Sequence, residues 1–315
     1  MLKTAQVIKS TGSFYTVQSD EKIYSCTMKG KFRTKGIRST SPVAVGDIVD
    51  FEIVSTQENT GIITKIHERR NALVRKSINL SKKSHVLAAN IDLSVVLAGL
   101  KEPHTYSLFI DRVLVAAESD GIKSAIVFNK TDIYSDQDMK QLEYLRQVYE
   151  AAGYQVFSIS VKQNKGIDAV RELIDNKTII FAGNSGVGKS SLINLLEPEL
   201  ELKTTEISEQ HEQGKHTTTF AEMFTIGNTQ VIDTPGIKGF GLVDIDFRFL
   251  SKYFPEMDRL RQQCKFNNCT HTHEPNCKIK EAVSFGTLSE ERYNNYLKIL
   301  NEQNGKYRED IYDLD

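Results

Sequence analysis

The stretch GNSGVGKSS, residues 183 to 191, decides the fold of this chain. It matches the pattern G-x-x-x-x-G-K-[S/T], follows the apolar run TIIFA and opens the helix-like segment SLINLLEPE, which is the setting of a phosphate-binding loop. The two glycines let the backbone turn so that its N–H groups point at a phosphate, and the following helix N-terminus favours the same anion. The stretch therefore predicts a nucleotide site on an α/β sheet.

The residues of this loop have distinct expected roles. Lys189 places a positive charge at the β- and γ-phosphates and is a candidate catalytic group, and the Ser190 hydroxyl can bind Mg²⁺. We expect the whole loop to contact the nucleotide, namely Gly183, Asn184, Ser185, Gly186, Val187, Gly188, Lys189, Ser190 and Ser191.

A guanine-specific motif precedes the loop. NKTD, residues 129 to 132, follows the apolar run SAIVF, and doubly wound sheets carry their ligand loops at such strand ends. The Asp132 carboxylate can accept from the ring N–H and the exocyclic amine of guanine, which adenine lacks at those positions. Asn129 can bond the carbonyl side of the base, the Lys130 stem can cover the ring, and Thr131 completes the motif. The expected nucleotide is therefore GTP or GDP.

Another loop resembles the one that closes over guanine in GTPases. It follows the run YQVFSI and contains Ser160, Val161 and Lys162. We expect these three residues to contribute to GTP binding.

Two further segments suit a γ-phosphate and its metal ion. VIDTPG, residues 231 to 236, offers Asp233 for Mg²⁺ and the Gly236 N–H for the γ-phosphate. GKHTTT, residues 214 to 219, occupies the expected place of a first switch, where one Thr binds Mg²⁺ when the γ-phosphate is present. Thr217, Thr218 and Thr219 are all candidates, and Thr218 is our choice.

The catalytic loop lacks the usual glutamine. Many GTPases place Gln directly after D-x-x-G to orient the attacking water, whereas this chain has Ile237 there. An alkyl side chain cannot hydrogen-bond water, so we expect slow hydrolysis unless another group or a bound partner positions it. His216 is the nearest polar candidate.

The order of these motifs is circularly permuted. NKTD and Ser160 precede the phosphate-binding loop, and both switches follow it. Apolar runs alternate with helix-like segments from about Ile91 onward, as in a doubly wound, mostly parallel α/β sheet. The second switch therefore leads directly into the C-terminal segment.

The charge of the chain is unevenly distributed. The sequence has 315 residues, 39% hydrophobic and 26% charged, with a formal net charge of -1, which fits two or three globular domains. Residues 1 to 83 contain 15 Lys and Arg against 7 Asp and Glu, so they carry +8 and the remaining 232 residues carry -9. The first quarter of the chain is thus a basic module.

The basic module has the pattern of a small β-barrel. Short β-rich runs (AQVIKS, SFYTVQS, KIYSCTMKG, GDIVDFEIV, TGIITKI) are separated by turn residues, which favours an OB-fold that binds nucleic acid. The basic residues form two groups along the sequence, Lys29, Lys31, Arg33, Lys35 and Arg38 in a loop-like segment, and Arg69, Arg70, Arg75, Lys76, Lys82 and Lys83 near the end of the module.

The cysteines indicate a metal site. Cys264, Cys269, His271 and Cys277 offer three thiolates and one imidazole, a donor set typical of tetrahedral structural Zn²⁺, and His273 is a competing ligand. Four protein ligands leave no open position for catalysis. Cys26 is expected to be a core residue.

In combination, these motifs resemble the RsgA family (YjeQ/YloQ) of bacterial small-ribosomal-subunit biogenesis GTPases. The resemblance covers essentially the whole chain. It implies GTP hydrolysis stimulated by the small subunit, contacts with its rRNA, a role in late maturation of that subunit and one structural zinc. It also implies that His216 participates in hydrolysis and that His271, rather than His273, binds the metal.

These observations lead to one set of expectations. We expect an OB-fold domain over residues 1 to 70, a circularly permuted GTPase domain over 71 to 240 and a helical zinc-binding domain over 241 to 315. No apolar run is long enough to span a bilayer and the N-terminal residues lack the apolar core of a signal peptide, so we expect a cytoplasmic protein. We also expect it to be a monomer. The alternatives are a GTP-sensing RNA-binding scaffold whose hydrolysis is incidental, and a regulatory GTPase acting on a protein.

Overall fold

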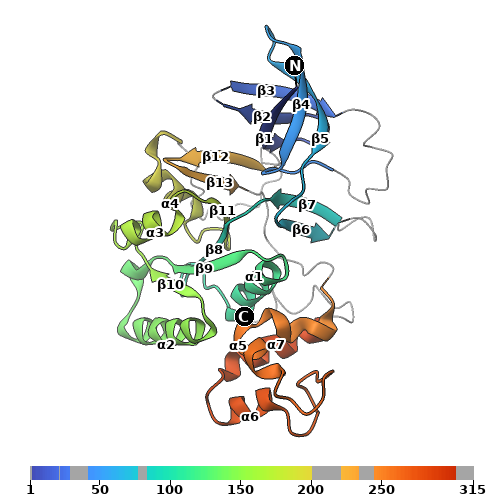
Figure 1. Cartoon of the computed structure of the whole chain (residues 1–315). Coiled ribbons are helices and arrows are strands. Elements are labelled where there is room, and N and C mark those ends of the chain that lie inside the picture. The colour runs from blue at the N-terminus through green and yellow to red at the C-terminus, as the bar shows by residue number, and fades with distance from the viewer. Residues whose placement is uncertain are drawn as a thin grey trace, which may run out of the picture.

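A computed structural model describes residues 2–20, 22–28, 42–76, 84–200, 221–233 and 245–302 of the chain. Figure 1 shows a barrel at one end, an α/β sheet in the middle and a helical segment at the other end. No helix in these ranges combines the length and hydrophobicity needed to span a bilayer.

The barrel has the strand order of an OB-fold. The first half of its long first strand pairs with the fourth strand, from Leu2↔Glu52 to Gln6↔Ile48, and the second half pairs with the second strand as far as Ser10↔Tyr15. The third and fifth strands pair in parallel, and the fourth and fifth strands pair antiparallel, which closes the barrel. The strands are β1 (Leu2–Ser10), β2 (Tyr15–Ser19), β3 (Lys22–Met28), β4 (Ile48–Ser55) and β5 (Thr60–Ile66). The prediction of a five-stranded barrel is confirmed.

The interior of the barrel is apolar, because alternate residues of each strand point inward. Cys26 is among these core residues, as expected from the sequence. The others include Val7, Tyr15, Val17, Val49, Phe51 and Ile63. The basic loop containing Lys29 to Arg38 lies outside the described residues.

The central sheet is mostly parallel. Its parallel strands lie in the order β10-β9-β8-β11-β13, and β12 pairs antiparallel with β13. Their bounds are β8 (Leu93–Ala98), β9 (Lys123–Phe128), β10 (Gln155–Ser158), β11 (Thr178–Ala182), β12 (Glu222–Ile226) and β13 (Thr229–Asp233). The predicted apolar runs form these parallel strands, and β12 is a strand that was not predicted from the sequence.

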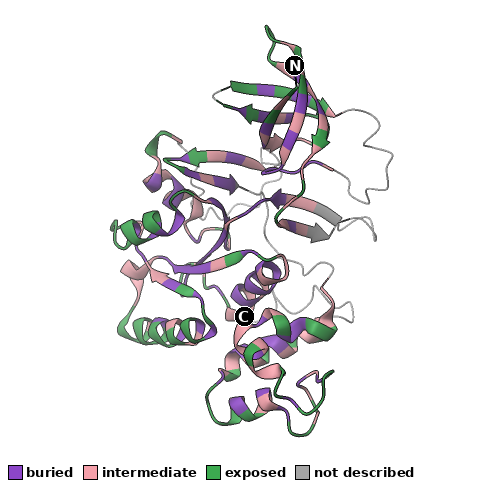
Figure 2. Ribbon diagram, in the orientation of Figure 1, coloured by how far each residue is buried: buried purple, intermediate pink, exposed green. Residues whose placement is uncertain are grey.

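Helices cover both faces of this sheet. On β8, Val96 and Ala98 pack in the same core as α1 (Ser107–Ser119) and α2 (Asp136–Ala152). Val95 and Leu97 pack instead in the core of α3 (Ile167–Ile174) and α4 (Lys189–Leu196). Figure 2 shows the central strands as largely buried. A strand covered on both sides needs a nearly continuous apolar run, which explains its sequence.

The barrel and the central sheet are one continuous sheet of 11 strands. β1 pairs antiparallel with β12 at Lys9↔Glu222, and the Lys9 ammonium lies 3.0 Å from a Glu222 carboxylate oxygen. A separate two-stranded sheet, β6 (Ala72–Lys76) and β7 (Ser84–Ala89), lies between barrel and central sheet in the sequence. β12 and β13 thus connect the barrel to the nucleotide loops.

The C-terminal segment is helical and packs on α1. The described residues after the central sheet form η4 (Phe247–Tyr253), α5 (Pro255–Arg261), α6 (Lys278–Ser284) and α7 (Glu290–Asn301). Val115 and Leu108 of α1 lie in or against the core of this segment. The predicted change from strands to helices is confirmed for these residues.

A buried ion cluster ties the helical segment to the central sheet. The Arg292 guanidinium on α7 donates to Asp111 on α1 at 2.5 Å and to Glu256 on α5 at 2.7 and 2.9 Å. The Asp111 side chain is fully buried and Arg292 is only 3% exposed. Asn295 also donates to Asp111, at 2.7 Å. The Arg292 and Asp111 charges are both removed from water, so the loss of either side chain would leave the other charge buried without its partner.

Candidate functional site

The predicted nucleotide loops lie at one edge of the central sheet. The loop 183–188 joins β11 to α4, NKTD follows β9, and residues 160–162 follow β10. These three strands are parallel members of one sheet, so their carboxyl ends face the same way. Loops at this edge form the ligand crevice of doubly wound sheets.

Two positions of the phosphate-binding loop require glycine. A Cβ at Gly183 would lie 2.5 Å from the Leu97 carbonyl oxygen. Gly188 has φ +103°, and a Cβ there would lie 2.3 Å from the Asn129 side-chain nitrogen. The close approach of β8 and of NKTD therefore explains both glycines, in addition to the turn that the motif demands.

The lysine and the two serines of the loop lie in the first turn of α4. The Lys189 ammonium donates to the carbonyl oxygens of Gly183 at 2.5 Å and Asn184 at 2.9 Å, so it lies against the loop. Ser190 and Ser191 are half-buried in the first turn of α4, and Val187 is fully buried in the core beneath. The helix N-terminus and the ammonium together favour a bound phosphate.

Asn129 holds three loops together. Its side chain donates to the Val187 carbonyl oxygen at 2.9 Å and accepts from the Val161 N–H at 3.1 Å, and the residue is only 2% exposed. The sequence suggested that Asn129 contacts the base. In the structure its carboxamide links the phosphate-binding loop to the loop of Ser160, Val161 and Lys162, so this side chain positions the site.

A serine orients the carboxylate of Asp132, the residue that the sequence assigns to guanine. The buried Ser160 hydroxyl donates to one Asp132 carboxylate oxygen at 2.6 Å and accepts from the Gln163 N–H at 3.1 Å. Thr131 donates from its hydroxyl to the Ile159 carbonyl oxygen at 3.0 Å. NKTD and the Ser160 loop are therefore directly bonded, as a joint guanine site requires, while Lys162 is exposed.

Tyr134 is a site residue that was not predicted from the sequence. Its hydroxyl donates to the Asn129 carbonyl oxygen at 2.7 Å and accepts from the Leu100 N–H at 2.8 Å. It thus fixes NKTD to the loop that follows β8. The Lys130 ammonium donates to the Glu102 carbonyl oxygen of the same loop. The only sequence signal was a tyrosine two residues after the motif.

The switch residues are described only in part. The backbone of Asp233 ends β13, as expected for a residue following the strand. His216, Thr217, Thr218, Thr219, Gly236 and Ile237 lie outside the described residues.

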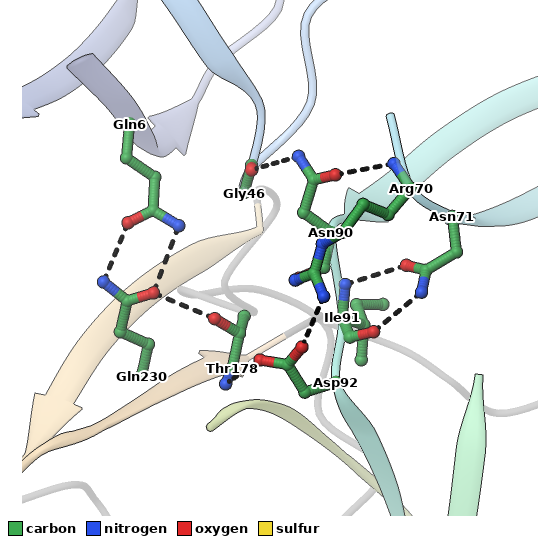
Figure 3. A network of polar contacts seen from close by, with 9 residues as sticks. All are labelled: Gln6, Gly46, Arg70, Asn71, Asn90, Ile91, Asp92, Thr178 and Gln230. Carbon is green, nitrogen blue, oxygen red and sulfur yellow. Dashed lines mark hydrogen bonds and ion pairs between the residues drawn. The ribbon is translucent and has the colours of Figure 1, made fainter. Parts of the chain in front are cut away.

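A polar seam joins the barrel to the strands that flank these switches (Figure 3). Gln6 of β1 and Gln230 of β13 exchange two hydrogen bonds, of 2.8 and 3.1 Å, and Gln230 also accepts from the Thr178 hydroxyl at 2.9 Å. The backbone N–H of Thr178 in turn donates to Asp92 at 2.9 Å. The seam therefore runs from the barrel to β11, the strand that carries the phosphate-binding loop.

Two arginines from the predicted basic cluster hold this region together. Arg69 donates to both carboxylate oxygens of the buried Asp47, at 2.7 and 2.8 Å. Arg70 donates to Asp92 at 2.8 Å and to the Asn90 carbonyl oxygen at 3.0 Å. The sequence grouped both with the candidate RNA surface, but the structure gives them intramolecular partners.

The Cys/His cluster forms a compact site. The ligand atoms of Cys264, Cys269, His271 and Cys277 all lie within 4.8 Å of one another, and all four residues are buried. The His271 Nδ1 lies 3.4 Å from the Cys277 sulfur and 3.7 Å from the Cys264 sulfur, and these two sulfurs are 3.9 Å apart. Tetrahedral zinc with bonds of about 2.0 to 2.3 Å places neighbouring ligand atoms roughly 3.5 to 3.8 Å apart. The donor set and its spacing fit that ion.

The orientation of His271 also suits a metal ligand. Its other ring nitrogen, Nε2, lies 3.1 Å from the Ser251 hydroxyl of η4, so Nδ1 is left to face the sulfurs. His273 is exposed and its Nδ1 contacts the Thr272 hydroxyl instead. The structure thus brings His271, and not His273, to the three thiols.

Comparisons with known proteins agree with this architecture. The family model described as RsgA GTPase matches residues 66–243, and the RsgA N-terminal domain model matches residues 4–63. A relative from Flavobacterium johnsoniae, called small ribosomal subunit biogenesis GTPase RsgA, is 51% identical, covering 99% of this chain and 97% of its own length. A relative of the same name from Christiangramia forsetii is 49% identical over 97% of this chain and 98% of its own length.

Solved structures show the same fold. YjeQ from Thermotoga maritima superposes with a TM-score of 0.79 and 31% identity, covering 97% of this chain and all of that one. YloQ, a circularly permuted GTPase, superposes with a TM-score of 0.73 and 28% identity, covering 96% of this chain and 95% of that one. The permuted motif order and the barrel agree with these matches, and the chain belongs to the RsgA family of GTPases.

Proposed function

We propose that this GTPase binds the small ribosomal subunit through its rRNA and hydrolyses GTP during late maturation of that subunit. The names of its relatives, small ribosomal subunit biogenesis GTPase, support the subunit as partner. The observation that carries the mechanism is the pairing of β1 with β12 together with the Gln6–Gln230 bonds. These contacts connect the basic barrel to the strands that flank both switch segments.

The roles of the nucleotide-site residues follow from their chemistry. Asp132, oriented by Ser160, reads guanine together with Asn129, which bonds the carbonyl side of the base. Asn129 and Tyr134 also hold the loops in register. The loop from Gly183 to Ser191 and the Lys189 ammonium bind the phosphates and stabilise the charge that develops during transfer. Ser190, Thr218 and Asp233 would hold Mg²⁺, which neutralises phosphate charge when bound. Gly236 would offer its N–H to the γ-phosphate.

The water-orienting role is assigned to His216. Ile237 cannot hydrogen-bond water, so turnover depends on another group, and His216 lies in the segment that immediately precedes the switch threonines. We propose that docked RNA orders this segment and brings the imidazole to the water. Equal subunit-stimulated turnover by His216→Ala and wild type would contradict this role.

The three parts of the chain then have separate tasks. Residues 1–70 form the RNA-binding barrel, 71–240 the GTPase domain, and 241–315 a helical domain in which Cys264, Cys269, His271 and Cys277 hold one structural zinc. We propose that the protein acts in the cytoplasm, where small subunits mature, and that it acts as a monomer. GTP favours the docked state, the docked RNA completes the catalytic site, and hydrolysis releases the protein.

Release kinetics distinguish this timer from an RNA-binding scaffold in which hydrolysis is incidental. The timer predicts long residence on small subunits with a non-hydrolysable GTP analogue and rapid release with GDP. Equal residence times with both nucleotides would favour the scaffold. Salt dependence distinguishes a regulatory GTPase that acts on a protein. Affinity for RNA should fall steeply with added salt because of the phosphate contacts, and affinity for a protein partner should not.

A further inference from the structure

The hydroxyl of Tyr134 takes the place of a hydrogen bond between two strands. β8 and β9 pair in parallel up to Ala98↔Phe128, and the Asn129 N–H then donates to the Ala98 carbonyl oxygen at 2.9 Å. In a parallel ladder the next bond would join the Leu100 N–H to the Asn129 carbonyl oxygen. The Tyr134 hydroxyl accepts from that N–H at 2.8 Å and donates to that carbonyl oxygen at 2.7 Å. It therefore bridges the two strands at the point where both end.

The β8 side of this bridge is fixed by other contacts as well. Leu100 belongs to a turn that the buried Thr105 closes. The Thr105 N–H donates to the Gly99 carbonyl oxygen at 2.7 Å, and its hydroxyl accepts from the Gly99 N–H at 3.0 Å. The Lys101 ammonium adds an ion pair with Asp138, at 2.5 Å, in the first turn of α2. The N–H that bonds the tyrosine is therefore presented by a firmly held turn.

On the β9 side, the bridge fixes the backbone of the guanine motif. The Asn129 carbonyl shares its peptide plane with the Lys130 nitrogen. Lys130 has φ +65°, a left-handed conformation that is uncommon for a residue with a side chain. The next residues form the turn η2 (Thr131–Ile133), and the Tyr134 N–H donates to the Thr131 carbonyl oxygen at 3.4 Å. The tyrosine thus closes the motif into a ring, bonding its first residue with the side chain and its third with the backbone.

Asp132 lies within this ring, and the motif is also bonded from the opposite side. The Ser160 hydroxyl donates to the Asp132 carboxylate at 2.6 Å, and the Thr131 N–H donates to the Ile159 carbonyl oxygen at 3.2 Å. Burial raises the pKa of the Tyr134 phenol, so the hydroxyl keeps the proton that it donates. The motif is therefore held between two anchors, the tyrosine on the β8 side and the residues that follow β10 on the other.

We propose that Tyr134 is a positioning residue that sets how tightly and how selectively the site holds guanine. Its hydroxyl keeps the ends of β8 and β9 apart, so that the Lys130 stem lies over the ring and the Asp132 carboxylate meets both the ring N–H and the exocyclic amine. Without the hydroxyl, the Leu100 N–H can bond the Asn129 carbonyl oxygen directly, which would draw the motif toward β8. The inference rests on the proposed function, since it assumes that NKTD reads guanine.

The experiment compares the wild type with Tyr134→Phe and Tyr296→Phe in the full chain loaded with zinc. Tyr134→Phe removes only the oxygen atom that bridges the strands. Tyr296→Phe is the matched control, because the hydroxyl of this buried tyrosine of α7 also donates to a backbone carbonyl oxygen, that of Thr270, at 2.7 Å. Zinc content and thermal midpoint verify that each variant is folded.

The measurements are the affinities for GDP, GTP and ITP, which lacks the exocyclic amine of guanine, and the rate of GDP release. For Tyr134→Phe we expect about 5- to 10-fold weaker binding of GDP and GTP, with GDP release faster by about the same factor. The preference for GTP over ITP should fall at least about threefold, because the contact with the amine is lost.

Turnover at saturating GTP separates binding from chemistry. In Tyr134→Phe it should stay within about twofold of the wild type, because the base makes the same contacts before and during phosphoryl transfer. The KM for GTP should rise with the loss of affinity. Tyr296→Phe should match the wild type in nucleotide affinity, in GDP release and in the preference for GTP over ITP.

Two results would overturn the inference. One is a preference for GTP over ITP in Tyr134→Phe that equals that of the wild type. The other is an equal loss of nucleotide affinity in Tyr296→Phe, which would make the effect one of general stability. A wild type that binds GTP and ITP equally would contradict the guanine assignment in the proposed function, whereas a wild-type preference that Tyr134→Phe retains contradicts only the role of Tyr134.

Discussion

The carboxamides of Gln6 on the barrel and Gln230 on β13 face each other and exchange two hydrogen bonds. The two residues are 224 positions apart in the sequence. Three residues after Gln230, β13 ends at Asp233 and the second switch begins. Under the proposed function, RNA that displaces the barrel would therefore act on a strand that leads directly into the second switch.

Breaking this pair should uncouple RNA from hydrolysis. Gln230→Leu leaves Gln6 and Thr178 without their partner, which we expect to cost about 1 to 3 kcal/mol of stability. Intrinsic GTP turnover should remain near that of the wild type, while stimulation by small subunits should fall several-fold. Gln147→Leu is the control, because Gln147 lies exposed on α2, where its side chain donates to Glu143. If small subunits stimulate GTP turnover equally in Gln230→Leu and Gln147→Leu, the Gln6–Gln230 pair stabilises the fold but does not couple the barrel to hydrolysis.

The Ser160–Asp132 contact makes a prediction about base choice. Ser160 anchors one Asp132 oxygen, so in Asp132→Asn the amide oxygen can keep that bond and the NH₂ group would face the base. A donor there opposes the guanine amine and suits the carbonyl of xanthine. We expect GTP affinity to fall about 10- to 100-fold and XTP affinity to rise, measured by competition with a labelled nucleotide. If GTP and XTP weaken equally, Asp132 does not read the base.

Loss of the metal should unfold a local segment. Cys277→Ser removes one of four ligands, and the loop of residues 264–277 has few apolar residues of its own to hold it. We expect loss of bound zinc, rapid proteolysis within this loop and nearly unchanged GTP affinity. Cys26→Ala, in the barrel core, should keep its zinc and its protease resistance in the loop. Full zinc content in Cys277→Ser would contradict the ligand assignment.

The buried Arg292 should contribute strongly to stability. In Arg292→Met, Asp111 and Glu256 lose their common cation, and the fully buried Asp111 is left with only neutral hydrogen bonds. We expect a loss of about 3 to 5 kcal/mol in the free energy of unfolding, measured with denaturant. Arg248→Met breaks an exposed pair and should cost less than about 1 kcal/mol. If both variants lose a similar free energy of unfolding, the buried Arg292 cluster stabilises the fold no more than an exposed ion pair does.

Much of the site was predictable because its chemistry is local in the sequence. GNSGVGKSS and NKTD carry their turn residues and functional groups in contiguous stretches, and the apolar runs that precede them are long enough to identify buried strands. The Cys/His spacing likewise lies within one loop. Each of these predictions required only neighbouring residues.

The contacts that were not predicted join residues far apart in the chain. Neither Gln6 nor Gln230 has a distinctive sequence context, and the short strand β12 is recognisable only beside β1. Arg69 and Arg70 resemble free surface charges in the sequence, because Asp47 and Asp92 each lie 22 positions away. The contacts of Asn129 with Val187 and Val161 likewise become visible only in the fold, because these residues lie 58 and 32 positions away. Tertiary pairing decides such roles.

The most direct test of the central claim is GTP turnover by the wild type, measured with and without purified small ribosomal subunits at fixed salt. Because Ile237 cannot orient water and the seam links the barrel to β13, we predict slow turnover alone and a rise of at least about tenfold with subunits. Turnover that is equal with and without subunits would contradict the claim.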